Sequence, residues 1–443
     1  MTRNPYTDWQ PLLLETIAEK IIRSSDYRRF LFDAAIVPGC RLLLARHRQR
    51  PDWPYVETKF NPNTGLNLPP EKYNLVYTWF LGRGSEALDD HLRRLDSVEA
   101  FGHAERAAMR ELFTSRIANM TRDLAAIADR HHDRIPFRVN RDLNAVDANG
   151  KPAAVDATFL GAGDIFGVKG LLSSTDPAIH GRALPLLRRA ADLARRDRFE
   201  YEQSAPPPGR DQGTRMLMQG VGACFAHKSR DLAASNEALG IAAAFLTEVL
   251  DKHYDSATTV FSECIDPATG ARSSLLDPGH ANELVGLGLG MIECLEKSPI
   301  ANGHCSLIAR AKRELPRLLI KSTALGFNPR QPGIFKSVNN QTGKPINADM
   351  PWWNLPETMR AAVRASVVAE NGLIRSQCLE IFRMCHNAYF SQYPNRANML
   401  FPFQTLNGET GRVVDVVPAV PEGDPLYHAN GAFMDMLDAA ERL

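Results

Sequence analysis

The stretch Asp266-Pro267-Ala268-Thr269-Gly270 is a turn signature that puts glycine where the backbone needs a positive φ, and the chain repeats it. After each such turn a short segment leads into a helix. Six units of about 74 residues would each have room for two helices and a hairpin-like loop. We therefore predict six helical hairpins closed in a ring, with the turns on one face; the alternative is six unrelated surface turns. The other turns lie at residues 61–65, 147–150, 339–343 and 407–411, with a weaker candidate at 206–213.

Most of the chain carries apolar residues at the three-and-four spacing of amphipathic helices, whereas strand-like runs are few and short. An α/β sheet would need recurrent Val/Ile-rich strands, so we expect an all-α protein. The helical stretches are 8–24, 71–95, 105–130, 183–196, 232–253, 281–296, 305–325, 356–369, 373–390 and 429–443. The run Gly286-Leu287-Gly288-Leu289-Gly290 follows no strand and predicts close helix packing, not a dinucleotide loop.

The composition excludes several classes of protein. The 443 residues carry 52 Lys and Arg against 51 Asp and Glu, so nothing indicates a nucleic-acid or membrane-surface partner. The N-terminus lacks the apolar core of a secretory signal, and no stretch approaches the ~20 apolar residues of a membrane span. The seven cysteines form no C-x-x-C pair, which indicates reduced thiols, a cytoplasmic protein and no zinc site.

Two segments that follow turns are alike in detail. Both Asp277-Pro278-Gly279-His280-Ala281-Asn282-Glu283 and Asp424-Pro425-Leu426-Tyr427-His428-Ala429-Asn430 place Asp-Pro before His-Ala-Asn at the start of an apolar helix. The positive end of the helix dipole favours neutral imidazole there, the form that acts as a base. A single such histidine is more often a capping or packing residue. Two in matching contexts favour a function, with His280 and His428 as catalytic residues.

Other side chains near the turns suit a small polar ligand. Glu283 shares a helix face with His280 and is expected to orient the imidazole or bind a hydroxyl. Of the adjacent Trp352 and Trp353, one is expected to pack and the other to stack on a sugar ring, with no basis for choosing between them. Arg83, between two glycines on an apolar helix, is either paired structurally or reaches a ligand oxygen.

Together these residues resemble the N-acylglucosamine 2-epimerase superfamily, which includes cellobiose 2-epimerase and the mannose-type aldose–ketose isomerases. The segment from Asp277 to Glu283, Trp352-Trp353-x-x-x-Glu357 and Tyr427-His428 carry the resemblance in the second half. The first half matches loosely, through Trp79-x-x-x-Arg83 and Asp164-Ile165-Phe166. The resemblance implies an (α/α)6 barrel with a central pocket, one domain over residues 1–443, residues 1–50 as an N-terminal extension of the barrel, and dimerisation.

The resemblance also implies roles for individual residues. His280 and His428 would match the two catalytic histidines of the family, and Arg83 its arginine near the reacting oxygens. The implied substrate-binding residues are Glu283, Trp352, Trp353 and Glu357, to which we add Arg215 and Gln219, four apart on one face. Two departures concern the substrate: Gln219 stands where relatives often have histidine, and a long segment, 416–423, precedes His428.

The implied activity is that of a sugar isomerase or 2-epimerase acting at C2 of a reducing aldose of the mannose, glucose or N-acylhexosamine type. Proton transfer between two histidines through an enediolate would need neither metal nor cofactor. The binding partner that the resemblance implies is the sugar substrate. One alternative is an (α/α)6 glycoside hydrolase or lyase using two carboxylates from Asp156, Asp164, Glu283 and Glu357. Another is a non-enzymatic, sugar-binding helical scaffold. The sequence does not choose between epimerase and isomerase.

Overall fold

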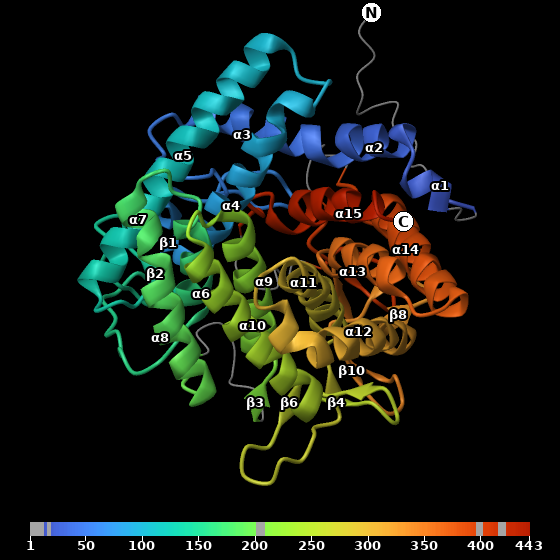
Figure 1. The fold of residues 1–443 in the computed structure, drawn as a ribbon. Helices are drawn as coiled ribbons and strands as arrows, with labels where there is room; N and C mark the ends of the chain where they lie inside the picture. Colours follow the sequence, from blue (N-terminus) through green and yellow to red (C-terminus); the bar gives the residue numbers. More distant parts are fainter. Residues whose placement is uncertain (1–12, 16–18, 201–208, 396–401, 415–421) are drawn as a thin grey trace, which may run out of the picture.

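The computed structural model, which describes residues 13–15, 19–200, 209–395, 402–414 and 422–443, is an (α/α)6 barrel (Figure 1). Each inner helix contacts the next around the ring, and the π-helical turn η5 (Tyr427–Gly431) closes the ring against α4. The inner helices are α4 (Thr78–Arg94), α6 (Ala162–Leu171), α9 (Gly213–Lys228), α11 (Pro278–Glu296), α13 (Asn354–Val368) and α15 (Ala432–Ala440).

The outer layer packs against the inner helices, as Figure 1 shows for α10, α12 and α14. Near the N-terminus, α2 lies against α14 through the ring pairs Tyr27–Phe382 and Phe30–Phe390, and α3 contacts α5. Residues 25–49 thus lie in the outer layer between α14 and α5. The outer helices are α2 (Ser25–Leu31) with η1 (Phe32–Ile36) and α3 (Val37–Gln49), α5 (His103–Arg130), α8 (Ala183–Arg195), α10 (Leu232–Lys252), α12 (Cys305–Gly326) and α14 (Gly372–Gln392), with short α1 (Glu19–Ile22) and α7 (Pro177–Gly181) beside them.

The five strongest turn predictions are confirmed. Their glycines, at positions 65, 150, 270, 343 and 411, have φ between 68° and 77°. In each turn the side chain of the opening Asn or Asp accepts the backbone N–H two residues on, an Asx-turn that holds the bend. Of the sixth candidate, residues 206–208 lie outside the described part, and Gly209 has φ 137°.

Strands are short and form small separate sheets rather than one large sheet. The antiparallel pairs are β1 (Val76–Tyr77) with β2 (Arg138–Val139), β3 (Arg210–Asp211) with β6 (Cys264–Ile265), β4 (Tyr254–Asp255) with β5 (Val260–Phe261), β8 (Phe327–Asn328) with β9 (Gly333–Ile334), β10 (Ser337–Asn339) with both β7 (Leu275–Leu276) and β11 (Pro345–Asn347), and β12 (Asp349–Pro351) with β13 (Thr405–Asn407). The pairs β1–β2, β3–β6, β7–β10 and β12–β13 link neighbouring loops around the mouth of the ring, whereas β4–β5, β8–β9 and β10–β11 are hairpins within one loop.

Most predicted helices are confirmed within a few residues, but the predicted stretch 71–95 is wrong at its start. There the chain makes a 3-10 turn (Pro70–Asn74) and strand β1 before α4 begins at Thr78. The stretch 8–24 lies largely outside the described residues. Helices α6 and α9 escaped prediction because they are buried nearly all round and so show no polar face.

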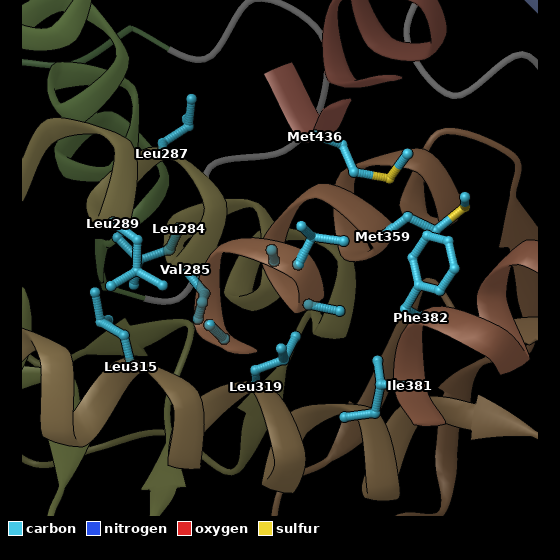
Figure 2. Close-up of a cluster of buried hydrophobic side chains, with 14 of the residues drawn as sticks. Leu284, Val285, Leu287, Leu289, Leu315, Leu319, Met359, Ile381, Phe382 and Met436 are labelled. Atoms are coloured by element: carbon cyan, nitrogen blue, oxygen red, sulfur yellow. The ribbon is translucent and has the colours of Figure 1, made fainter. Parts of the chain in front are cut away.

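Glycines in α11 confirm the predicted close packing. A Cβ at Gly286 would lie 3.1 Å from Nε of Arg360, and one at Gly290 would lie 3.2 Å from Cζ of Arg364. The inner ring is therefore tight at α11 and α13. Figure 2 shows the apolar core beside it, where side chains of α11, α12, α13, α14 and α15 meet. The buried side chains there include Leu284, Val285, Leu289, Leu315, Leu319, Met359, Phe382 and Met436.

All seven cysteines are unpaired thiols, as the sequence predicts. Among the helices of the described residues, none combines the length and apolar character that crossing a membrane requires.

Candidate active site

A cavity of about 390 Å³ opens at the N-terminal ends of the inner helices. It brings together the three predicted catalytic residues, His280 from α11, His428 from η5 and Arg83 from α4. Glu283 and both adjacent tryptophans also line it. Residues from the first, fourth, fifth and sixth units therefore converge on one space.

His280 sits on the first turn of α11, held by carboxylates. Its backbone N–H donates to Oδ1 of Asp277, the N-cap of the helix, at 3.1 Å. Its Nδ1–H donates to Oε1 of Glu263 at 2.8 Å, with Oδ2 of Asp277 3.4 Å away. Burial alone would lower the pKa of His280, but the charges of Asp277 and Glu263 outweigh burial and raise it to about 9. At neutral pH His280 is therefore an imidazolium. Its Nδ1–H is bonded to Glu263, and its Nε2–H remains as the proton that it could donate.

His428 lies in the opposite electrostatic environment. Its Nδ1–H donates to Oε1 of Glu357 at 2.9 Å, while Nη1 of Arg83 donates to its Nε2 at 3.0 Å. Burial and the Arg83 cation lower its pKa to about 4. His428 is therefore neutral, with the lone pair on Nε2, the atom that can take a proton.

The prediction that the helix dipole keeps both histidines neutral is thus wrong for His280. Two carboxylates within hydrogen-bonding range act more strongly than the partial charge of a helix end. Two titratable groups whose environments push their pKa values apart are the usual arrangement of an acid and a base in one site. The two histidines therefore differ in charge state, whereas the sequence left them equivalent.

The two tryptophans differ in what they contact. Trp352 is 2% exposed and its indole N–H donates to Oε1 of Gln404 at 3.2 Å, so it is the packing member of the pair. The ring of Trp353 lies 5.7 Å from that of His280 and 5.4 Å from that of His428, centroid to centroid. Trp353 therefore touches both imidazoles and offers an aromatic face between them in the cavity.

Arg83 is held by aromatic rings. Its guanidinium lies over Phe166 at 4.2 Å, Trp79 at 4.3 Å and Tyr427 at 4.9 Å from the ring centroids. A Cβ at the preceding Gly82 would overlap the carbonyl of Phe166, so glycine is needed there for α4 to approach α6. The buried Nε of Arg83 has no hydrogen-bond partner among the described residues, which leaves a donor for a ligand oxygen.

Glu357 does not line the cavity as a substrate-binding residue would. It is 1% exposed, and while Oε1 accepts from His428 its Oε2 accepts from Arg360. Glu357 thus orients the imidazole from behind. The role foreseen for Glu283 beside His280 falls instead to Glu263, so Glu283 lines the cavity without a part in that contact.

Glu283, Glu357 and His428 bring three potential metal-ligand atoms within 4.8 Å of one another. Their surroundings do not suit a cation. Both ring nitrogens of His428 already have partners, and the cations of Arg83 and Arg360 contact this cluster. The donor set is therefore compensated by guanidinium groups rather than arranged for a metal.

Arg215 and Gln219 do not reach the cavity, contrary to prediction. Arg215 is buried in the third unit, donating to the Asp197 carboxylate and the Ala194 carbonyl, and Gln219 donates to the carbonyl of Arg215. The four-residue spacing put them on one face, but Arg215 reaches the end of α8 and Gln219 bonds back to its own helix, so neither lines the cavity. From α9 the cavity receives Thr214 and Leu217 instead.

Sequence reasoning missed Glu263 and Lys336. Nζ of Lys336 donates to Oδ2 of Asp277 at 2.6 Å and lies 5.6 Å from the ring centroid of Trp353. Neither residue belongs to a motif, since both reach the site from strands and loops that pair across units. The repeated Asp-Pro dipeptide was a usable signal for Asp277 and Asp424, both of which border the histidines.

No protein-family model matches the chain, and no curated protein sequence matches it. Solved structures do match the chain. Cellobiose 2-epimerase from Bacillus thermoamylovorans aligns with a TM-score of 0.66 at 12% identity, over 96% of this chain and 100% of that one. A D-mannose isomerase aligns with a TM-score of 0.64 at 12% identity, over 96% and 100%. Cellobiose 2-epimerase from Spirochaeta thermophila follows with a TM-score of 0.62 at 15% identity, over 96% and 97%.

At these identities the likeness establishes the fold. The (α/α)6 barrel expected from the resemblance is confirmed over nearly the whole chain.

Proposed function

We propose that this protein is a sugar isomerase or 2-epimerase acting at C2 of a reducing aldose through an enediolate. The observation that carries the proposal is a cavity holding two histidines of opposite protonation, each with a carboxylate on Nδ1. Proton transfer at a carbon next to a carbonyl needs a base and an acid present together at one pH. His428 and His280 meet that need near neutrality.

In the proposed reaction Arg83 transfers its N–H from Nε2 of His428 to a substrate oxygen, and the freed lone pair of Nε2 takes the proton from C2 of the open-chain aldose. The electrons of the C2–H bond move into an enediolate, whose developing charge needs cationic partners in a water-poor space. Arg83 and the imidazolium of His280 supply them. Return of a proton from His280 to the opposite face of C2 gives the epimer. Delivery to C1, with the proton on O2 passing to O1, gives the ketose.

The hydrolase alternative has less support from the side chains. Of its four candidate carboxylates, Glu283 lines the cavity. Asp164 is buried in an ion pair with Arg134, Asp156 is an exposed turn residue bonded to Thr158, and Glu357 is engaged by His428 and Arg360. A glycosidase needs two carboxyl groups flanking one bond. These four do not provide that pair.

The test is proton NMR of aldoses incubated with the enzyme in D2O: mannose, glucose, N-acetylglucosamine, N-acetylmannosamine and cellobiose. We expect deuterium at C2 of a product aldose, or at C1 of a product ketose, and the product decides between epimerase and isomerase. A His280→Asn/His428→Asn double variant is the control and should leave every sugar unlabelled. Release of a free reducing sugar from cellobiose without exchange would overturn the proposal in favour of hydrolysis.

A further inference from the structure

A buried ion pair joins the first and sixth units beside the cavity. Lys59 and Glu422 form it with side chains 2% and 3% exposed. Nζ of Lys59 also donates to the carbonyl of Leu75, and the second carboxylate oxygen of Glu422 accepts from Oγ1 of Thr58 at 2.9 Å. Removing two charges from water is costly, so a pair this deep needs such additional hydrogen bonds.

Both ends of this pair lead directly to catalytic side chains. Leu75 precedes β1 and α4, the helix that carries Arg83. Glu422 lines the cavity and is followed closely by Asp424, whose carboxylate accepts the backbone N–H groups of Tyr427 and His428. Lys59 is thus bonded at once to the segment before Arg83 and to the segment before His428.

The backbone reinforces this connection. The N–H of Gly423 donates to the carbonyl of Thr58 at 2.9 Å, and a Cβ at Gly423 would overlap the ring of Phe60. Residues 58–60 therefore hold residues 422–424 in close contact. Arg83 and His428 face each other across the seam between the two units, and each lies a few residues after one of these bonded segments.

We infer that Lys59 is a positioning residue that sets the Arg83–His428 contact by fixing the segment of Glu422 to the segment of Leu75. The inference rests on the proposed function for its catalytic meaning, although the geometry it concerns can be measured without substrate. Without the ammonium group, the sixth-unit segment loses its anchor and His428 moves away from the guanidinium. The charged groups facing His428 are Arg83 from α4, Glu283 from α11, Glu357 and Arg360 from α13, and Asp424 from its own segment.

The experiment follows histidine protonation by NMR in protein with labelled histidine side chains, using His428→Asn to assign the signal. In the wild type His428 should stay neutral at pH 6. In Lys59→Met, His428 should lie farther from the Arg83 cation. The titration midpoint of His428 should therefore rise by about one pH unit or more. Glu422→Gln, which removes the partner but keeps the shape, should produce the same change.

Arg134→Met is the matched control, because Arg134 is 0% exposed and pairs with Asp164 at 2.9 Å, and neither residue is among the charged groups that face His428. It should lower the melting temperature without moving the His428 signal. With a substrate in hand, Lys59→Met should lower kcat about tenfold with little change in KM. A Lys59→Met or Glu422→Gln variant that melts early but keeps the wild-type His428 titration would overturn the inference. Absence of any sugar turnover in the wild type would count against the proposed function alone, since the titration is read without substrate.

Discussion

The two histidine segments begin alike and end in opposite charge states. In the first, Gly279 follows Asp277-Pro278 and leads straight into a regular α-helix. In the second there is one residue more, Leu426 takes a left-handed conformation with φ 68°, and a π-helical turn carries His428. The extra residue moves His428 away from its own capping carboxylate and against Arg83, whereas His280 stays bonded between two acids.

The difference shows that the shared motif determines where an imidazole is placed, whereas the neighbouring side chains determine its protonation state. The carboxylate of Asp424 accepts backbone N–H groups of Tyr427 and His428, so it stabilises the turn that carries His428. Asp277 does the same for His280 but also lies 3.4 Å from the ring. One motif thus yields a protonated imidazole in one place and a neutral imidazole in the other.

The strongest way to break the comparison is to remove each histidine. We expect His428→Asn and His280→Asn each to lower kcat by about 10²–10⁴-fold, the usual contribution of a positioned acid or base. The measurement is kcat on the sugar identified by deuterium exchange, with the melting temperature as the check on folding. The double variant should lose little more than either single one, because both groups serve one proton transfer. Near wild-type turnover in both single variants would refute the assignment.

A pH profile sharpens the comparison. The proposed mechanism requires neutral His428 and protonated His280, so activity should be lost as pH falls through about 4 and again as pH rises through about 9. Glu263→Gln removes one of the charges that raise the pKa of His280, so the alkaline limb should move down by about one pH unit.

The acid limb is the internal control for that variant, since it belongs to His428 and should stay in place. If Glu263→Gln moved both limbs equally, the two histidines would not be titrating independently and the assignment of acid and base would fail.

The smallest effect concerns the backbone of the two segments. A Cβ at Gly279 would overlap the buried amide of Asn354, so Gly279→Ala should cost about 1–3 kcal/mol of unfolding free energy as overpacking does. Gly431→Ala, in the second segment, is the matched control because its Cβ would meet no atom within 4 Å. Urea unfolding should separate the two variants, with Gly431→Ala at or above wild-type stability. Equal stabilities would mean that the first segment is not tightly packed.

Much of the fold could be predicted because its signals are local. The Asx-turns with their glycines, the amphipathic outer helices and the paired Asp-Pro and His-Ala-Asn segments each lie within a few consecutive residues. The all-buried α6 and α9 have no such local pattern. Their places in the inner ring follow from packing rather than from periodicity.

Part of the cavity lining was predictable from the sequence, but its electrostatics were not. His280, His428 and Arg83 come from recognisable contexts, yet the partners that set their charge do not. Glu263 reaches His280 from 17 residues away, and Glu357 reaches His428 from 71. Arg215 and Gln219 show the converse, because a correct helical spacing does not say which way the face points.

The seam between the first and sixth units also bears on how the protein folds. Arg83 and His428 meet across 345 positions of chain, and the Lys59–Glu422 pair spans 363. Contacts this distant in sequence carry a large loop-closure entropy, so they form late, after hairpins built from neighbouring helices. Intermediates in which those hairpins have formed but the seam is open would keep nearly native helix content and yet hold an unassembled catalytic pair. Recovery of activity should therefore lag behind recovery of helical circular dichroism during refolding.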